Sequence, residues 1–140
     1  MPEMEYVEPS SLAEVFDALD RYGEDGRLIA GGTGLINLMK QRLVQPAALI
    51  GLRKLSGSLG TITSENGSVR LGALVIHRQL EASPVVKQYI PLVAEAFGHV
   101  ATIRIRNIAT IGGGLAHGDP NLDPPSTYLA LDATVRIASR

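Results

Sequence analysis

The feature that most constrains this fold is a pair of glycine-rich stretches, each of which adjoins an apolar segment. The first is Ala30-Gly31-Gly32-Thr33-Gly34, and the second, residues 110–115, contains three consecutive glycines. Glycine loses more backbone entropy on folding than any other residue, so a packed domain keeps such runs where the backbone turns sharply or lies close to another group. The question is whether that group is protein or ligand.

Local signals predict alternating helices and strands in the N-terminal half. Ser11 and Glu14 have the spacing of a capping box, which predicts the first helix. The apolar run at residues 27–30 predicts a buried strand that leads directly into the first glycine-rich loop. Helical spacing resumes at residues 35–39, and a second strand is expected at residues 48–52. The first loop is therefore expected to join a strand to a helix.

The second half begins with a hairpin signal. Asn66-Gly67 stands between two β-rich runs, and this dipeptide favours the tight turn of a hairpin. Pro91 interrupts a continuous apolar face, so we expect two short helices or a kink there, with Ser83 before Pro84 as the N-cap of the first helical segment. The other elements expected are helices at residues 76–82 and 123–131, and a strand at residues 134–138.

Composition limits the classes of partner. The chain has 140 residues, 45% of them hydrophobic, which is enough for one globular domain with a core. Thirteen basic and 14 acidic residues give a net charge of −1, which offers no electrostatic footprint for nucleic acid. No cysteine is present, so this chain ligates no iron–sulfur cluster. The acidic N-terminus and the lack of a long apolar run predict a cytoplasmic protein without membrane insertion.

The amides of both glycine-rich stretches could converge on a phosphate or pyrophosphate, because successive free N–H groups form an anion-binding nest. Taken singly, each stretch is equally consistent with a tight turn. Neither has the dinucleotide fingerprint G-x-G-x-x-G, since Asn37 and His117 occupy the last glycine position. Neither has the lysine of a P-loop. A Rossmann site and a P-loop NTPase are excluded.

Three polar residues near the second stretch have alternative interpretations. His117, Asp119 and Asp123 include ordinary metal-ligand types. Asp119 and Asp123 each precede a proline, however, which is typical of a turn residue and of a helix N-cap. We therefore expect no metal site. Asp123 could also accept hydrogen bonds from ligand hydroxyls.

Other candidate residues favour structural roles. Arg104 and Arg106 alternate with isoleucines, which predicts a strand with both guanidinium groups on one face. That face is more simply explained as solvated than as a partner or phosphate contact. His77 and His99 are expected to be packing or surface residues rather than catalysts.

Several segments, in order along the chain, resemble the FAD-binding (medium) subunit of the molybdenum hydroxylases. This family includes carbon monoxide dehydrogenase, xanthine dehydrogenase and 4-hydroxybenzoyl-CoA reductase. The matching segments are Leu-Ile-Ala-Gly-Gly-Thr-Gly-Leu at 28–35, Leu-Met-Lys with Arg-Leu and Pro at 38–46, Gly-Ala-Leu with His at 72–77, Arg-Asn-Ile-Ala-Thr-Ile-Gly-Gly at 106–113, and Asp-Pro with Asp-Pro-Pro at 119–125.

The resemblance implies an α+β FAD-binding module of the vanillyl-alcohol-oxidase or CO-dehydrogenase-flavoprotein type, made of two small α/β subdomains. They would span residues 1–54 and 55–140. Family members continue well past this length, so the second subdomain is expected to be incomplete, or truncated, at its C-terminal end.

By position, the resemblance carries over a set of cofactor-binding residues and no catalytic or metal-binding residue, since the flavin performs the redox chemistry. Asp123 is expected to accept a hydrogen bond from a ligand hydroxyl. Gly34 and Gly114 depart from the family, which usually has an acid, serine or other polar residue at the first position and asparagine at the second. The residues implied to hold FAD are Ala30, Gly31, Gly32, Thr33, Gly34, Leu35, Thr110, Gly113, Gly114, His117 and Asp123.

The activity implied is electron relay within a heteromer. Molybdopterin would lie on a large partner subunit and [2Fe–2S] clusters on a small one, and electrons would pass through FAD to NAD⁺ or another acceptor. Two alternatives stay open. The chain could be a cofactor-free or nucleotide-binding interaction module that keeps the fold, or an assembly subunit in which both glycine-rich stretches are turns.

Overall fold

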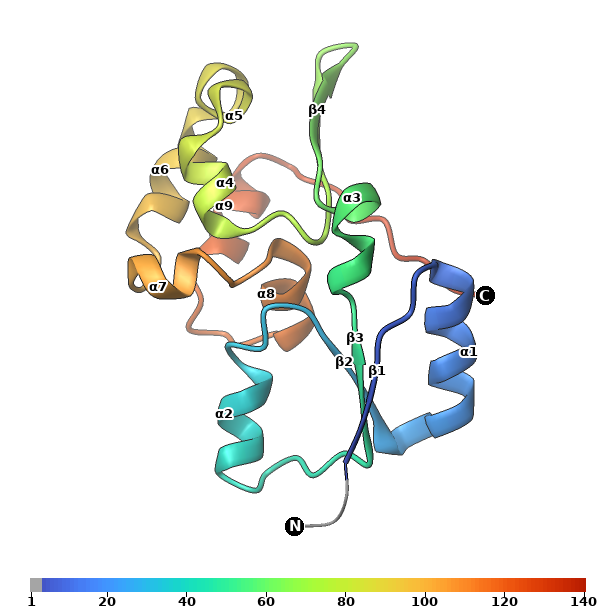
Figure 1. The fold of residues 1–140 in the computed structure, drawn as a ribbon. Helices are drawn as coiled ribbons and strands as arrows, with labels where there is room; N and C mark the ends of the chain where they lie inside the picture. The colour runs from blue at the N-terminus through green and yellow to red at the C-terminus, as the bar shows by residue number, and fades with distance from the viewer. Residues whose placement is uncertain (1–3) are drawn as a thin grey trace.

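The computed structural model describes residues 4–140, which form two sheets and a helical region (Figure 1). The first sheet is parallel with strand order β1-β3-β2, and the second is the antiparallel hairpin β4-β5. The strands are β1 Glu5–Val7, β2 Gly26–Ile29, β3 Ala48–Gly51, β4 Ile62–Glu65 and β5 Ser68–Leu71.

The helices are short, and most of them follow the hairpin. Two 3₁₀ turns, Gly23–Asp25 and Arg53–Leu55, extend helical segments of the first half. The α-helices are α1 Leu12–Tyr22, α2 Leu35–Lys40, α3 Ser56–Leu59, α4 His77–Ala82, α5 Pro84–Tyr89, α6 Pro91–His99, α7 Ile103–Arg106, α8 Ile111–His117 and α9 Pro124–Ala130.

Local signals place most helix ends as predicted. The Ser11 hydroxyl caps α1 by accepting a hydrogen bond from the Glu14 amide at 3.2 Å. The Glu14 carboxylate accepts in return from the Ser10 amide at 2.7 Å, one residue earlier than a capping box requires. Ser83 caps α5 in the same way, and Pro91 begins α6 directly after α5 has ended. The prediction of two short helices around Pro91 is confirmed.

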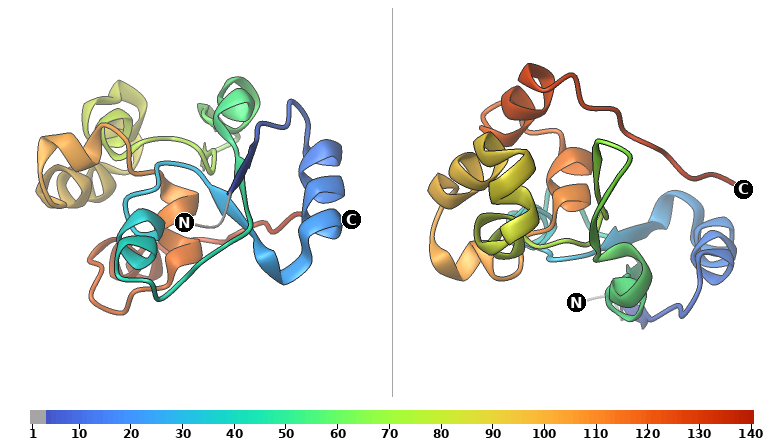
Figure 2. Two further views of the ribbon diagram at one scale, coloured as in Figure 1. Left: turned by 60° about the horizontal axis from the view of Figure 1, so that its bottom comes forward. Right: turned by 90° about the horizontal axis from the view of Figure 1, so that it is seen from above.

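The first sheet has its core at the central strand. Ala48, Leu49 and Ile50 of β3 are buried because β1 and β2 pair with β3 on both sides. Helix α1 covers one face of this sheet, and α2 lies on the opposite side of it (Figures 1 and 2). A hydrophobic cluster of Val15, Leu55 and Leu74 joins α1 to the segments that follow β3.

The helical region has a second hydrophobic cluster around Phe97, which is 1% exposed. Ile62 and Leu71 of the hairpin pack against this cluster from outside. The hairpin turn is the predicted one, with φ of 51° at Asn66 and 77° at Gly67. The division at residue 54 stays a prediction, and Leu55 and Leu74 pack in the first cluster. The other members of the second cluster are Val75, Leu80, Val86, Val93, Ala94 and Ile111.

Two strand predictions are wrong. Residues 103–106 form α7, because the Thr102 hydroxyl caps a helical turn by accepting from the Ile105 amide. Residues 134–138 form neither strand nor helix, since no described strand pairs with them. Instead the chain end runs back to α1, where Arg140 pairs with two aspartates of that helix (Figure 1).

Candidate functional site

The first glycine-rich loop carries a row of free backbone donors. It connects β2 to α2, and the amides of residues 31–35 donate no hydrogen bond among residues 4–140. The carbonyls of Gly32 and Gly34 do accept bonds, from Ile36 at 2.9 Å and from Leu38 at 3.2 Å. Buried backbone N–H groups are nearly always paired in a folded protein, whereas these half-buried loop amides have no partner within the described protein. Five consecutive unpaired donors are therefore available to an anion.

The second stretch differs from the predicted loop with exposed amides. Thr110 is the N-cap of α8, so the three glycines lie in the first turn of a helix. The four amides of residues 111–114 donate, in order, to the Val75 carbonyl at 3.0 Å, the Ala73 carbonyl at 2.8 Å, the Thr110 hydroxyl at 3.1 Å and the Thr110 carbonyl at 3.0 Å. These amides are already used, so the prediction of free donors from both stretches is wrong for the second.

The two stretches nevertheless meet. A Cβ placed on Gly31 would lie 1.9 Å from the Ile108 carbonyl oxygen, so the first loop touches the backbone that leads into α8. A Cβ on Gly34 would lie 3.0 Å from the His117 ring at the far end of α8. The segments are about 80 residues apart in the sequence, and the loop between β2 and α2 passes beside α8 in Figure 1.

The glycines fall into three groups by backbone conformation and by what surrounds them. At Gly31 and Gly112 neighbouring backbone leaves no room for a side chain. The Gly31 contact is given above, and a Cβ on Gly112 would lie 2.9 Å from the Ala73 carbonyl oxygen. Gly32 is required by its left-handed backbone, with φ of +73°. Gly114, by contrast, has nothing within 4 Å of a Cβ position. The bare backbone thus makes close contact with protein at some positions and faces open space at Gly114.

The remaining predicted residues lie around this junction. Ala30 is 4.0 Å from a Cβ position on Gly113. His117 is exposed at the end of α8, and Thr33 is half-buried in the first loop. Asp123 is exposed and is the N-cap of α9 as predicted, but its side chain makes no capping hydrogen bond.

The structure links Asp123 to α8 through its neighbours. Leu122 and Pro124 line a small apolar cavity of about 20 Å³ together with Gly114. Asp119 is engaged in its own turn, where its carboxylate accepts from the Asn121 amide at 2.9 Å. Within residues 4–140, no three histidine or acidic side chains gather closely enough to hold a metal ion.

A buried histidine, His77, packs close to α8. His77 is 7% exposed, and its ring lies edge-on to Phe97 with centroids 4.7 Å apart. Burial lowers the pKa of His77, so the ring is neutral at ordinary pH. Burial also raises the pKa of the Tyr128 hydroxyl, and the Tyr128 ring packs against Phe97 with centroids 6.0 Å apart. The prediction that His77 is a packing residue is confirmed.

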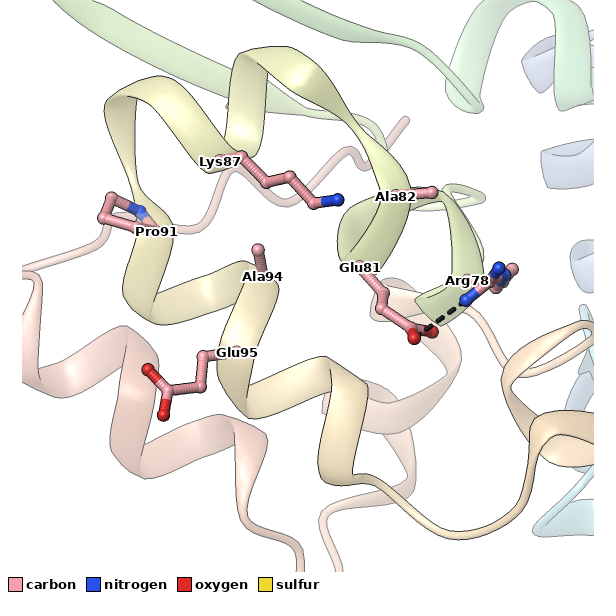
Figure 3. Close-up of a pocket in the computed structure, with 7 residues that line it drawn as sticks. All are labelled: Arg78, Glu81, Ala82, Lys87, Pro91, Ala94 and Glu95. Atoms are coloured by element: carbon pink, nitrogen blue, oxygen red, sulfur yellow. Dashed lines mark ion pairs between the residues drawn. The ribbon is translucent and has the colours of Figure 1, made fainter.

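A larger hollow of about 440 Å³ lies between α4, α5 and α6 (Figure 3). Its charged side chains are of both signs, and Arg78 is paired with Glu81 at 2.8 Å. No aromatic ring and none of the glycine residues lines it, so it has no surface on which a flavin ring could stack. Its lining residues are Arg78, Glu81, Ala82, Lys87, Pro91, Ala94 and Glu95.

Comparison with known proteins decides the family. The family model described as "FAD binding domain in molybdopterin dehydrogenase" matches residues 2–140. The chain belongs to this family. The cofactor of the family domain is FAD, and the implied α+β CO-dehydrogenase-flavoprotein fold is confirmed by the structural neighbours described next.

Relatives at well above 30% identity support this membership. The chain is 39% identical over 132 residues to the carbon monoxide dehydrogenase medium chain of Hydrogenophaga pseudoflava, covering 94% of this chain and 46% of the relative. It is 37% identical over 139 residues to the nicotine 6-hydroxylase medium subunit of Paenarthrobacter nicotinovorans, covering 99% and 48%. The chain thus spans about half the length of the curated relatives it matches.

Solved structures agree with the sequence matches. A carbon monoxide dehydrogenase structure from Hydrogenophaga pseudoflava aligns with a TM-score of 0.89 at 40% identity, covering 92% of this chain and 45% of that one. Quinoline 2-oxidoreductase from Pseudomonas putida 86 aligns with a TM-score of 0.83 at 38% identity, covering 89% of this chain and 43% of that one.

Among the described residues, no helix has both the length and the apolar character that a membrane crossing requires.

Proposed function

We propose that this chain binds FAD, with the pyrophosphate against the unpaired amides of residues 31–35. The observation that carries the proposal is that these five free donors lie on a loop that meets the backbone leading into α8 at Gly31 and the far end of α8 at Gly34. A phosphate oxygen accepts readily from several converging amides, and charge-assisted bonds of this kind are stronger than neutral ones. Membership of a family of FAD-binding domains supports the same ligand.

Each implied site residue then has a role in holding the dinucleotide. Thr33 offers a hydroxyl beside the free amides, and Thr110 fixes the start of α8 by capping it. Asp123 has a free carboxylate with which to accept from a hydroxyl of the cofactor. His117 lies against Gly34 at the edge of the loop. FAD supplies the electron-transfer chemistry when bound, and the chain binds and orients it.

We further propose that the protein relays electrons as part of a heteromer. Relatives of this chain are named as medium or FAD subunits of dehydrogenases and hydroxylases. This chain contains no cysteine with which to hold an iron–sulfur cluster. Molybdopterin and [2Fe–2S] clusters are therefore assigned to large and small partner subunits, and NAD⁺ or another acceptor takes the electrons from the flavin.

A ligand series tests the site. We expect FAD and ADP to raise the melting temperature and to compete with one another, because both carry the pyrophosphate that the amides recognise. Riboflavin, which has the flavin ring without phosphate, should have little effect. Equal stabilisation by riboflavin would place the binding energy away from residues 31–35. If none of the three compounds raises the melting temperature, the fold has lost its cofactor.

A further inference from the structure

Arg106 is a largely buried arginine that contacts three segments of the helical region. Its side chain is 14% exposed, and its Nε donates to the Glu81 carboxylate at 3.2 Å. Its Nη1 donates to the carbonyls of Val100 at 3.0 Å and Ala101 at 3.2 Å, directly after α6. One guanidinium group therefore joins α4, the end of α6 and α7, a geometry that a lysine ammonium cannot reproduce in full.

The segment held by Arg106 leads to the cofactor junction. After α7, the Ile108 carbonyl contacts Gly31, and the Ala109 carbonyl accepts from the His77 amide at 3.0 Å. Thr110 then forms a bridge with Ile76 and caps α8. The stretch is thus tied to the start of α4 by backbone bonds and to the end of α4 by the Glu81–Arg106 pair. Between the two ties it forms the surface on which the first glycine-rich loop rests.

A second arginine provides a natural comparison. Arg78 also pairs with Glu81, at 2.8 Å, but its side chain is 47% exposed and faces the polar hollow of Figure 3. The hydrogen bond from Arg78, together with the charges of both arginines, holds the pKa of Glu81 below its ordinary value, so the carboxylate is ionised. Both arginines carry the same charge and share the same partner. Only Arg106 also holds the backbone that leads to the junction.

We propose that Arg106 is a positioning residue for FAD binding: it braces residues 100–110 against α4 and so fixes the distance between the two glycine-rich stretches. This inference rests on the proposed function for its ligand. Arg106 acts through the Ile108–Gly31 contact and does not itself touch the cofactor. The sequence alone did not indicate this role, because the alternation of Arg104 and Arg106 with isoleucines predicted a strand whose arginine face is solvated.

The experiment measures FAD affinity and amide exchange in Arg106→Gln, Arg106→Lys and the control Arg78→Gln. FAD affinity is measured by flavin fluorescence at a temperature where circular dichroism shows every variant to be folded. We expect Arg106→Gln to weaken FAD binding about tenfold, the size typical of changes in a coupled network. Arg106→Lys should recover part of this loss, since it restores the charge. Arg78→Gln should change affinity less than twofold.

Hydrogen exchange supplies a measurement that does not depend on FAD. The amides of His77, Ile111 and Gly112 should exchange faster in Arg106→Gln than in Arg78→Gln, because the His77 amide donates to Ala109 of the braced stretch and Ile111 and Gly112 follow that stretch directly. Equal exchange in the two variants, or wild-type FAD affinity in Arg106→Gln, would overturn the brace. If the wild-type protein binds no FAD, the proposed function fails, and the exchange comparison alone decides the brace. If Arg106→Gln does not fold, FAD affinity and amide exchange are instead measured in Arg106→Lys and Glu81→Gln and compared with those of Arg78→Gln.

Discussion

Replacing Gly31 with alanine tests the contact that joins the two glycine-rich stretches. The new Cβ would lie 1.9 Å from the Ile108 carbonyl oxygen, whereas ordinary van der Waals contact begins at 3.4 Å. The loop and the segment must therefore separate by about 1.5 Å, the difference between these two distances. Both partners are backbone, so neither can rotate away. Overpacking of this kind costs about 1–3 kcal/mol of folding free energy, and we expect the upper end.

FAD affinity should fall more steeply than stability. A shift of this size moves the free amides of residues 31–35 away from α8, and each hydrogen bond lost to the pyrophosphate is worth about 1 kcal/mol. Losing two or three of them corresponds to roughly a hundredfold weaker binding. Urea unfolding followed by circular dichroism gives the stability change, and fluorescence titration with FAD gives the affinity.

Gly114→Ala is the matched control for stability. Its Cβ meets nothing within 4 Å, and the residue lies inside α8. Alanine is favoured over glycine in a helix, so this variant should be more stable than the wild type by about 0.5–1 kcal/mol. If Gly31→Ala unfolds at the wild-type urea concentration and binds FAD as the wild type does, the contact between the two stretches does not shape the site.

Three further predictions concern single side chains. Gly114→Asn should tighten FAD binding several-fold, as measured by titration, because an amide side chain can fill the open space at this position and donate a hydrogen bond to the cofactor; unchanged or weaker binding would contradict this. Asp123→Ala should weaken FAD binding and leave the urea midpoint nearly unchanged, since its side chain makes no capping bond; a large loss of stability would reveal a structural role. Wild-type stability should fall as pH drops below about 6.5, because unfolded His77 takes up a proton that the buried ring resists. His77→Gln should flatten that part of the stability profile in urea titrations at several pH values, and an equal slope in both proteins would assign it to other groups.

Elements with local signals were predictable. Ser11 and Ser83 each accept from the amide three residues ahead, and Asn66-Gly67 fixes its turn by backbone preference alone. Pro91 separates two helices because its ring cannot continue the first. None of these signals needs knowledge of the rest of the fold, which is why the helix starts and the hairpin agree with the structure.

Most of the wrong predictions depended on distant partners; residues 103–106 are the exception, because the Thr102 cap that begins α7 is local. Residues 134–138 alternate as a strand does, but a strand requires a neighbour, and none is present among the described residues. The amides of Ile111 and Gly112 were expected to be free, and they donate to residues 73 and 75, which lie more than 30 positions earlier. The pairing of Arg106 with Glu81 spans 25 residues. Such contacts are set by packing, and no local pattern specifies them.

The candidate site, too, was predictable from the sequence only in part. The first loop was identified from composition and position, and its free amides agree with that interpretation. That the second stretch would lie against the first followed from the resemblance and is found in the structure, through Gly31 and Gly34. The assignment of individual residues to FAD stays a prediction.

The visible absorbance spectrum of the purified protein tests the central claim most directly. It is recorded as purified, and again after incubation with excess FAD followed by desalting. Our account predicts flavin bands that survive desalting in the wild type and are lost in Gly31→Ala. A colourless wild-type protein after both steps, with no change in melting temperature on adding FAD, would contradict the assignment of residues 31–35 to the cofactor.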